Sequence, residues 1–260
     1  MSTNRSWDRA GALGVATSGR RRAELVALTA GIPSVSELFT FMRDAELRFE
    51  TLRMRIEERT MTARGEHLAV MDVALRHEGD ARVTTTDPSR GPADSYEVWV
   101  SDGAVVRTYS AAHRLSTTRP IRNRPRGLAD KDFPGASRVY EPLTALPMES
   151  LPDTFVHPAG YCQNVLATGR TWISGTEIVA GRETIVVECD HPRSTELAAD
   201  RPDFHIQIAV DRADGAILRL IETIGGGVTR HAEVVSFEPD APLAAFVFED
   251  PLPTDGATLY

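Results

Sequence analysis

The sequence is short of basic charge, and of lysine in particular. Its 260 residues include 29 Lys and Arg against 37 Asp and Glu, which gives a formal net charge of −8 at pH 7. Lys131 is the one lysine, and this excess of arginine is typical of a GC-rich genome rather than of a particular chemistry. Nucleic-acid-binding domains are normally basic, with their charge on one face. We therefore expect no nucleic-acid partner.

The sequence also lacks a long apolar run. A membrane-spanning helix needs about 18 or more consecutive apolar residues, and no stretch approaches this length, so we expect no membrane span. Arg20-Arg21-Arg22 followed by AELVALTAGIPSV resembles a signal peptide, but Glu24 interrupts the apolar run and no small-residue cleavage site follows. Our interpretation is an uncleaved, cytoplasmic chain.

Cysteine is scarce, and the common catalytic motifs are absent. Cys162 and Cys189 could form one disulfide only if their Cα atoms came within about 7 Å, and we expect two buried free thiols. The sequence contains no G-x-G-x-x-G, Walker loop, G-x-S-x-G or H-E-x-x-H. The usual dinucleotide, phosphate, acyl-transfer and zinc-hydrolase chemistries therefore have no support in the sequence.

Three short stretches remain as candidates for chemistry. Gly225-Gly226-Gly227 lies between expected strands with no helix after it, so we interpret it as a hairpin loop rather than a phosphate site. The run 188–191, Glu-Cys-Asp-His, holds four types of metal ligand, but neighbours in a strand point to opposite faces, so we expect no metal. His157 and Cys162 could pair as base and nucleophile, and this enzyme hypothesis stays open beside that of a loop histidine near a buried thiol. We expect no cofactor.

The apolar pattern predicts one N-terminal helix and then two groups of β-strands. Ser34 and Glu37 form an S-x-x-E capping box, and apolar residues recur at helical spacing up to about residue 48. Beyond this point the period changes to two, as in a half-buried strand. Strands are expected at about 52–57, 67–76, 81–87, 96–110 as a hairpin, near 115, 177–189 as a hairpin, 204–222 as a hairpin, 229–237 and 246–248.

The hairpin VWVSDGAVVRTYS, with a turn at Gly103, is apolar on both faces. Its register places one group of side chains together with Arg107, while Trp99 and Val106 face the other way. That first group consists of Tyr96, Val98, Val100, Val105 and Tyr109. A sheet with one wet face would alternate apolar with polar residues. We therefore expect both faces of this hairpin to be covered.

These elements predict an α+β fold with a single strongly curved antiparallel sheet of about nine to eleven strands. The expected organisation is a flexible segment at 1–30, a domain at 31–253 and a tail at 254–260. Within the domain, the proline-rich region 119–158 is expected to be an insertion, a long loop followed by short helical turns. Its arginines could form an anion site, but the nearby aspartates favour a solvated loop. The arginines are Arg119, Arg122, Arg124 and Arg126.

Five stretches, in this order, carry a resemblance to a known group of proteins. They are ELFTFMRDAELRFETLRMRIEE, YEVWVSDGAVVRTYS, IVAGRETIVVEC, IAVDRADGAILRL and FVFEDP, and together they span about residues 34–251. The sequence resembles the LolA/RseB/LppX-like bacterial lipoprotein-carrier superfamily. The resemblance implies an unclosed half-barrel that wraps around the N-terminal helix and a mid-chain helical segment, with an apolar cavity for acyl chains.

The resemblance implies a binding protein rather than an enzyme. The first hypothesis is that the cavity takes a lipid, an acylated ligand or another hydrophobic molecule, since each buried CH₂ contributes about 0.8 kcal/mol without any catalytic group. The alternative is an RseB-like sensor module whose sheet edge or region 119–158 engages a protein partner. Candidate cavity-lining residues are Phe39, Met42, Trp99, Tyr109, Trp172, Phe204 and Ile206.

Overall fold

The structure is a computed structural model that describes residues 25, 27–90, 95–121, 142–192 and 201–249, and the backbone of 258–259. Most of the expected segment 1–30, the middle of the region 119–158 and most of the tail 254–260 lie outside the described residues, as do Arg122, Arg124 and Arg126. The predicted domain boundaries therefore stay predictions. No helix in the described ranges is both long and apolar enough to span a membrane.

The described elements follow the predicted order of helix, strands, short helices and strands. The helices are α2 (Val35–Arg43), the 3-10 turn η1 (Ala45–Arg48), α3 (Leu151–Val156), α4 (Pro158–Asn164), the 3-10 turn η2 (Leu166–Thr168) and α5 (Phe246–Glu249). The strands are β1 (Thr51–Thr62), β2 (Gly65–Arg76), β3 (Asp80–Thr86), β4 (Tyr96–Asp102), β5 (Val105–Ser110), β6 (Leu115–Pro120), β7 (Arg170–Val179), β8 (Arg182–Asp190), β9 (Phe204–Asp211), β10 (Ile217–Ile224), β11 (Gly227–Pro239) and β12 (Thr258–Leu259).

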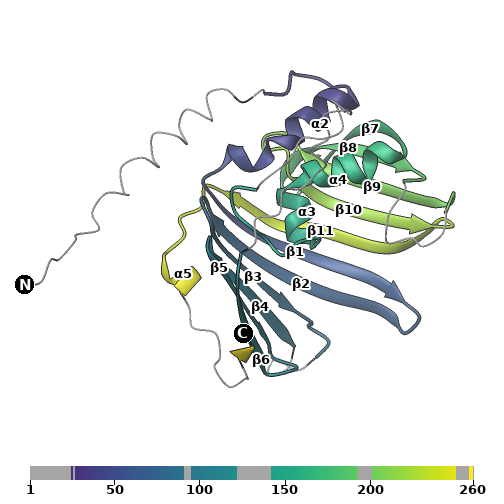
Figure 1. The fold of residues 1–260 in the computed structure, drawn as a ribbon. Helices are drawn as coiled ribbons and strands as arrows, with labels where there is room; N and C mark the ends of the chain where they lie inside the picture. Colours follow the sequence, from purple (N-terminus) through teal and green to yellow (C-terminus); the bar gives the residue numbers. More distant parts are fainter. Residues whose placement is uncertain are drawn as a thin grey trace, which may run out of the picture.

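The strands form one open sheet made of two antiparallel meanders. The order is β12-β6-β5-β4-β3-β2-β1-β11-β10-β9-β8-β7, so the meanders β1–β6 and β7–β11 join where β1 pairs with β11. Among the described strands the two ends of this order do not pair, so the sheet is not closed. Figure 1 shows the resulting strong bend, with α2, α3 and α4 on its inner side. The predicted curved, unclosed antiparallel sheet is confirmed, and β12 adds two residues in parallel to β6.

The N-terminal helix begins where the capping box predicts. Ser34 Oγ accepts a hydrogen bond from the Glu37 N–H at 3.2 Å, and the Ser34 N–H donates to Glu37 Oε2 at 2.7 Å. This reciprocal pair satisfies two amide groups that a helix start leaves free. The helix ends at Arg43, and the 3-10 turn η1 carries the chain on to Phe49, just before β1.

The main core lies between the concave face of the sheet and the helices. Alternate residues of β1 and β2 point to this side because side chains in a strand change face at every residue. Residues in cross-strand register, such as Leu52 with Leu75 and Met54 with Val73, are buried together there. The helices contribute fully buried side chains to the same cluster, namely Leu38, Met42, Phe155 and Leu166.

The convex face of the hairpin β4–β5 carries a second, smaller apolar cluster. Val98, Val100, Tyr109 and Ala111 are buried there with Tyr96 against them, and the Tyr96 and Tyr109 rings lie 5.7 Å apart. Every second side chain of β4 and of β5 thus lies on the same face, as the sequence predicts. The pairing of Ser101 with Val106 places the turn at Gly103 and Ala104, and Gly103 adopts a φ of +82°.

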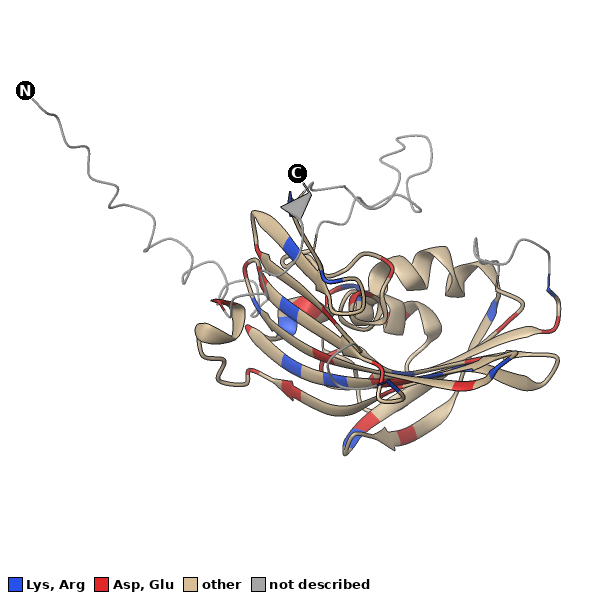
Figure 2. Ribbon diagram, turned by 90° about the horizontal axis from the view of Figure 1, so that it is seen from below, with Lys and Arg blue, Asp and Glu red and all other residues tan. Residues whose placement is uncertain are grey.

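The segment around 246–248 is a helical turn, so the strand predicted there is wrong. The turn α5 contacts β3 and β4, and it lies on the outer side of the bent sheet (Figure 2). Its amides bond locally: the Val247 N–H donates to the Ala244 carbonyl and the Phe248 N–H to the Ala245 carbonyl. Phe248 is buried with the Arg76 guanidinium 5.0 Å from its ring centre. This turn is therefore part of the cover that the apolar convex face requires.

Candidate functional site

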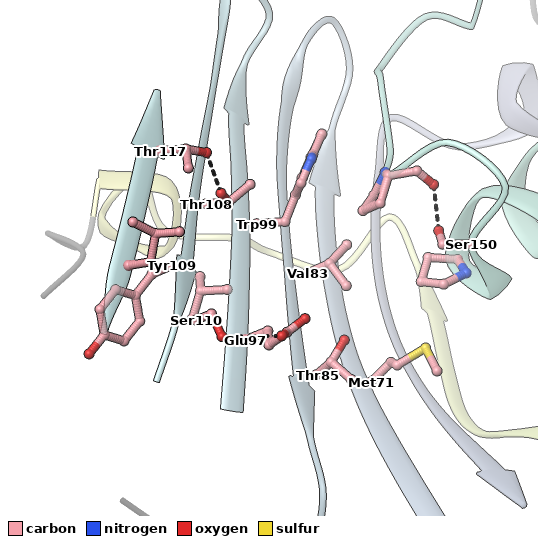
Figure 3. Close-up of a pocket in the computed structure, with 14 residues that line it drawn as sticks. Met71, Val83, Thr85, Glu97, Trp99, Thr108, Tyr109, Ser110, Thr117 and Ser150 are labelled. Atoms are coloured by element: carbon pink, nitrogen blue, oxygen red, sulfur yellow. Dashed lines mark hydrogen bonds between the residues drawn. The ribbon is translucent and has the colours of Figure 1, made fainter. Parts of the chain in front are cut away.

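A hollow of about 370 Å³ lies on the concave face of β2–β6, beside the start of α3. Side chains from alternate positions of these five strands make its floor, and the segment that leads into α3 makes one wall (Figure 3). The floor residues are Met71, Val83, Thr85, Glu97, Trp99, Thr108, Ser110, Leu115 and Thr117. The wall residues are Pro147, Ser150 and Pro152. The volume falls within the usual range of ligand pockets, at its lower end.

The hollow exists because small side chains replace large ones at the concave positions of β5 and β6. Around β1 and β2 these positions hold leucine, methionine and valine, which fill the space under the helices. On β5 and β6 the corresponding positions in the hollow are Thr108, Ser110 and Thr117, with Leu115 as the one large side chain among them. Trp99 on β4 is half-buried beside them and packs against the main core. Short side chains next to a large aromatic leave room for a ligand against an apolar surface.

Most hydroxyl groups of the lining are already hydrogen-bonded within the protein. The Thr108 and Thr117 hydroxyls lie 2.6 Å apart, and Ser150 Oγ donates to the Pro147 carbonyl at 2.6 Å. Ser110 Oγ donates to Glu97 Oε1 at 3.3 Å. Because these hydroxyls already have hydrogen-bond partners, they do not require a polar ligand, and the hollow offers a ligand chiefly apolar contact. Glu97 is the one Asp, Glu, Lys, Arg or His among the described residues of the lining.

A buried charged cluster holds α3 in place beside the hollow. His157 lies at the C-terminal end of α3, with Nδ1 2.9 Å from Asp153 Oδ1 and Nε2 3.2 Å from Glu46 Oε2 on η1. All three side chains are at most 5% exposed. Burial alone would lower the pKa of His157, but its hydrogen bonds to Asp153 and Glu46 outweigh this and raise the pKa to about 9. The imidazolium therefore links the helix that forms the wall to the turn before β1.

Further hydrogen bonds satisfy the two carboxylates of this cluster. The Leu143 N–H donates to Glu46 Oε2 at 2.9 Å, and the Glu149 N–H donates to Asp153 Oδ2 at 3.3 Å. Ser150 caps α3 by accepting from the Asp153 N–H. Buried charges are tolerated when paired and hydrogen-bonded in this way. The arrangement indicates a structural role for His157, which sequence reasoning treated as a candidate base.

The seven residues predicted to line a cavity are distributed over four places in the structure. Trp99 and Tyr109 border the hollow, although the Tyr109 ring lies on the convex face against Tyr96. Met42, Phe204 and Ile206 are buried in the main core. Their part in ligand binding, like that of the others, stays a prediction.

The remaining two predicted residues lie on other surfaces. Phe39 borders a more open groove of about 550 Å³ between α2 and the start of β7. Trp172 lies on the convex face of β7, where its ring is 6.1 Å from that of His205. The structure does not bring these two residues to the hollow.

Sequence reasoning missed most of the floor of the hollow. Met71, Val83, Leu115 and Thr117 were not singled out, because each is an ordinary strand residue without a chemical signature. One signal was present: the register of the hairpin β4–β5 places Thr108 directly opposite Trp99 and Ser110 opposite Glu97. Small residues facing a tryptophan across a strand pair indicate a hollow rather than a filled core.

The other candidate sites do not assemble into catalytic arrangements. Cys162 Sγ lies 3.7 Å from Met42 Sδ, and burial raises the pKa of the thiol, so it stays protonated. His157 instead contacts the carboxylates of Glu46 and Asp153. Both cysteines are free and buried, as expected. Glu188 and Asp190 hold His205 between them on the convex face, while Cys189 is buried on the other side.

The glycine run forms a hairpin turn, as predicted. Gly225 and Gly226 adopt φ values of +59° and +79° between β10 and β11. Positive φ at two successive positions is what a tight hairpin turn requires. Within the described residues no group of three or more His, Cys, Asp or Glu side chains could hold a metal ion.

Comparison with known proteins finds similarity at the level of structure. No family model matches the sequence, and no curated protein is similar to it. MucB from the MucA/MucB complex of Pseudomonas aeruginosa is 12% identical to this chain, with a TM-score of 0.48. The match covers 86% of this chain and 62% of the MucB chain. The chain thus spans less than two thirds of the MucB chain.

Two further solved structures extend the comparison. The Mycobacterium tuberculosis lipoprotein LppX is 10% identical, over 81% of this chain and 99% of its own, with a TM-score of 0.43. A LolA superfamily protein from Nitrosomonas europaea is 8% identical, over 83% of this chain and 97% of its own, with a TM-score of 0.33. Likeness at these levels carries no function over to this chain. The described strands form the open, bent antiparallel sheet around helices that the sequence predicts.

Proposed function

We propose that this protein binds a hydrophobic molecule with an alkyl or acyl chain in the hollow on β2–β6, without catalysing a reaction. The observation that carries the proposal is the hollow itself, whose floor includes Met71, Val83, Trp99 and Leu115 and most of whose hydroxyls are already hydrogen-bonded within the protein. An occupant would gain about 0.8 kcal/mol for each CH₂ it buries.

A protein partner is the alternative. One of the similar structures is MucB in complex with MucA, which is a complex between two proteins. Native mass spectrometry of the protein purified from its own host separates the two cases. We expect a co-purified hydrophobic small molecule, whereas a protein without one would favour the alternative. The cytoplasmic location expected from the sequence stays a prediction, and cell fractionation tests it.

Filling the hollow is expected to abolish binding. Thr117 and Thr118 are neighbours on β6, but Thr117 lines the hollow while Thr118 is exposed on the other face. In Thr117→Trp the larger side chain occupies the space of the ligand, so the affinity for a decyl-chain probe should fall at least tenfold. Thr118→Trp is the matched control and should bind as the wild type does. Isothermal titration calorimetry measures both, and equal affinities in the two variants would place the binding site elsewhere.

A further inference from the structure

Among the described residues that line the hollow, one is negatively charged, and it lies at one end. Glu97 is on the concave face of β4, opposite Thr85 of β3 and Ser110 of β5. Figure 3 shows its carboxylate between these two residues, at the same end as Met71. Its side-chain hydrogen bond comes from Ser110, a neutral donor. No Lys, Arg or His is among the described residues that line the hollow.

The basic residues of the neighbouring strands do not neutralise Glu97. Arg107 projects to the convex face and pairs there with Asp102 at 2.8 Å. Arg119 of β6 is on the concave face, but it is opposite Val106, near the far end of the hairpin. That end is four residues along β4 from Glu97, or roughly 13 Å at 3.3 Å per residue.

The turn after β5 brings two more basic residues to the end of the sheet where Glu97 lies. His113 and Arg114 are both exposed in this turn. The ion pairs found among the described residues include none between either of them and Glu97. The carboxylate is thus available to a charged group that enters the hollow from solvent.

A carboxylate beside an apolar hollow discriminates between ligand head groups. A positively charged amine would gain both an ion pair and a charge-assisted hydrogen bond from Glu97. A carboxylate or phosphate would meet like charge and would have to keep its distance. A neutral head group would meet neither effect. We propose that the ligand is a cationic amphiphile, with an amine at Glu97 and its alkyl chain along Val83 and Trp99. This assignment rests on the proposed function.

Three probes of equal chain length test this assignment: decylamine, decanol and decanoate. Because Glu97 is exposed to solvent, its contribution is that of a partly screened ion pair. We expect decylamine to bind about three- to fivefold more tightly than decanol, and decanoate to bind about as much more weakly. The advantage of decylamine should shrink as the salt concentration rises, because screening acts on exposed charges.

The variant Glu97→Gln removes the charge and keeps the shape. It should bind decylamine and decanol equally, with its affinity for decanol unchanged from the wild type. Asp72→Asn is the matched control, since Asp72 is exposed on the convex face of the same sheet and should leave the head-group preference intact. If the wild type binds all three probes equally, the head-group assignment is wrong while the binding site stands. If it binds none of them, the proposed function fails, and the assignment with it.

Discussion

Replacing His157 with alanine is expected to lower the free energy of unfolding by about 3–5 kcal/mol, because it leaves two buried carboxylates without their counter-charge. Glu46 and Asp153 are almost fully buried, and the imidazolium lies within 3.2 Å of both. Removing it forces the carboxylates to take up protons or to draw water into the space beneath α3. Chemical denaturation with urea, followed by circular dichroism, measures the loss.

The control for this variant is a histidine–carboxylate pair on the surface. His67 Nε2 lies 3.2 Å from Asp87 Oδ2, but its side chain is 47% exposed. His67→Ala should cost no more than about 1 kcal/mol, as is usual for exposed pairs. Equal losses in the two variants would mean that the cluster around His157 does not hold the helix as the structure indicates.

The same cluster predicts how stability changes with pH. The pKa of His157 is raised to about 9 in the folded protein, against about 6.5 in an unfolded chain. The folded state then holds the proton more tightly, so this stabilisation is fully present below pH 6.5 and is lost as the pH rises through 9. The contribution is on the order of 3 kcal/mol.

The pH effect is measured as the difference between the wild type and His157→Gln. Burial beside Asp211 raises the pKa of Asp214 to about 6, and this group is common to the two proteins. His77 is also common to both, but its pKa is lowered by burial and, to a smaller extent, by the charge of His157, which the variant removes. Urea unfolding at pH 6 and at pH 9.5 should therefore bring the two proteins closer at the higher pH. A constant difference across this range would show that His157 is neutral in the folded state.

Truncating Phe155 to alanine is the second change with a large expected effect, a loss of about 3–5 kcal/mol. Phe155 lies on α3, is fully buried in the main core and anchors the short helix against the sheet. The six residues of α3 are too few for a helix to be stable alone, so this burial keeps the helix in place. Thermal unfolding by calorimetry measures the loss.

Phe246 provides the matched control for Phe155. It is 66% exposed on α5, so Phe246→Ala should change the free energy of unfolding by no more than about 0.5 kcal/mol. Because α3 forms one wall of the hollow, Phe155→Ala should also weaken the binding of a decyl-chain probe, while Phe246→Ala should not. A Phe155→Ala protein as stable as the wild type would contradict the packing described for α3.

The fold was predictable to the extent that it depends on local periodicity and turn chemistry. The capping box at Ser34 and the turns at Gly103 and Gly225-Gly226 lie where the sequence predicts, because each depends on a few neighbouring residues. The pairing of β1 with β11, about 180 residues apart, has no local signature. The segment at 246–248 was mistaken for a strand because its apolar residues fit either state, and only the sheet face beneath it decides.

The candidate site was predictable only in kind. An apolar concavity follows from strands with apolar residues on both faces, and Trp99 borders the hollow. Met42 and Ile206 are equally apolar in sequence but are buried in the core, because the helices cover that half of the sheet. Which concave positions stay uncovered depends on where α3 lies. That in turn depends on contacts between His157 and Glu46, which are 111 positions apart in the sequence.

The most direct measurement of the central claim is photo-crosslinking with an alkyl diazirine amine, followed by peptide mass spectrometry. We expect labels on the concave residues of β2–β6, above all Met71 and Trp99, and their loss in Thr117→Trp. Labels confined to the groove at Phe39 or to the convex face, or unchanged labelling in Thr117→Trp, would contradict it.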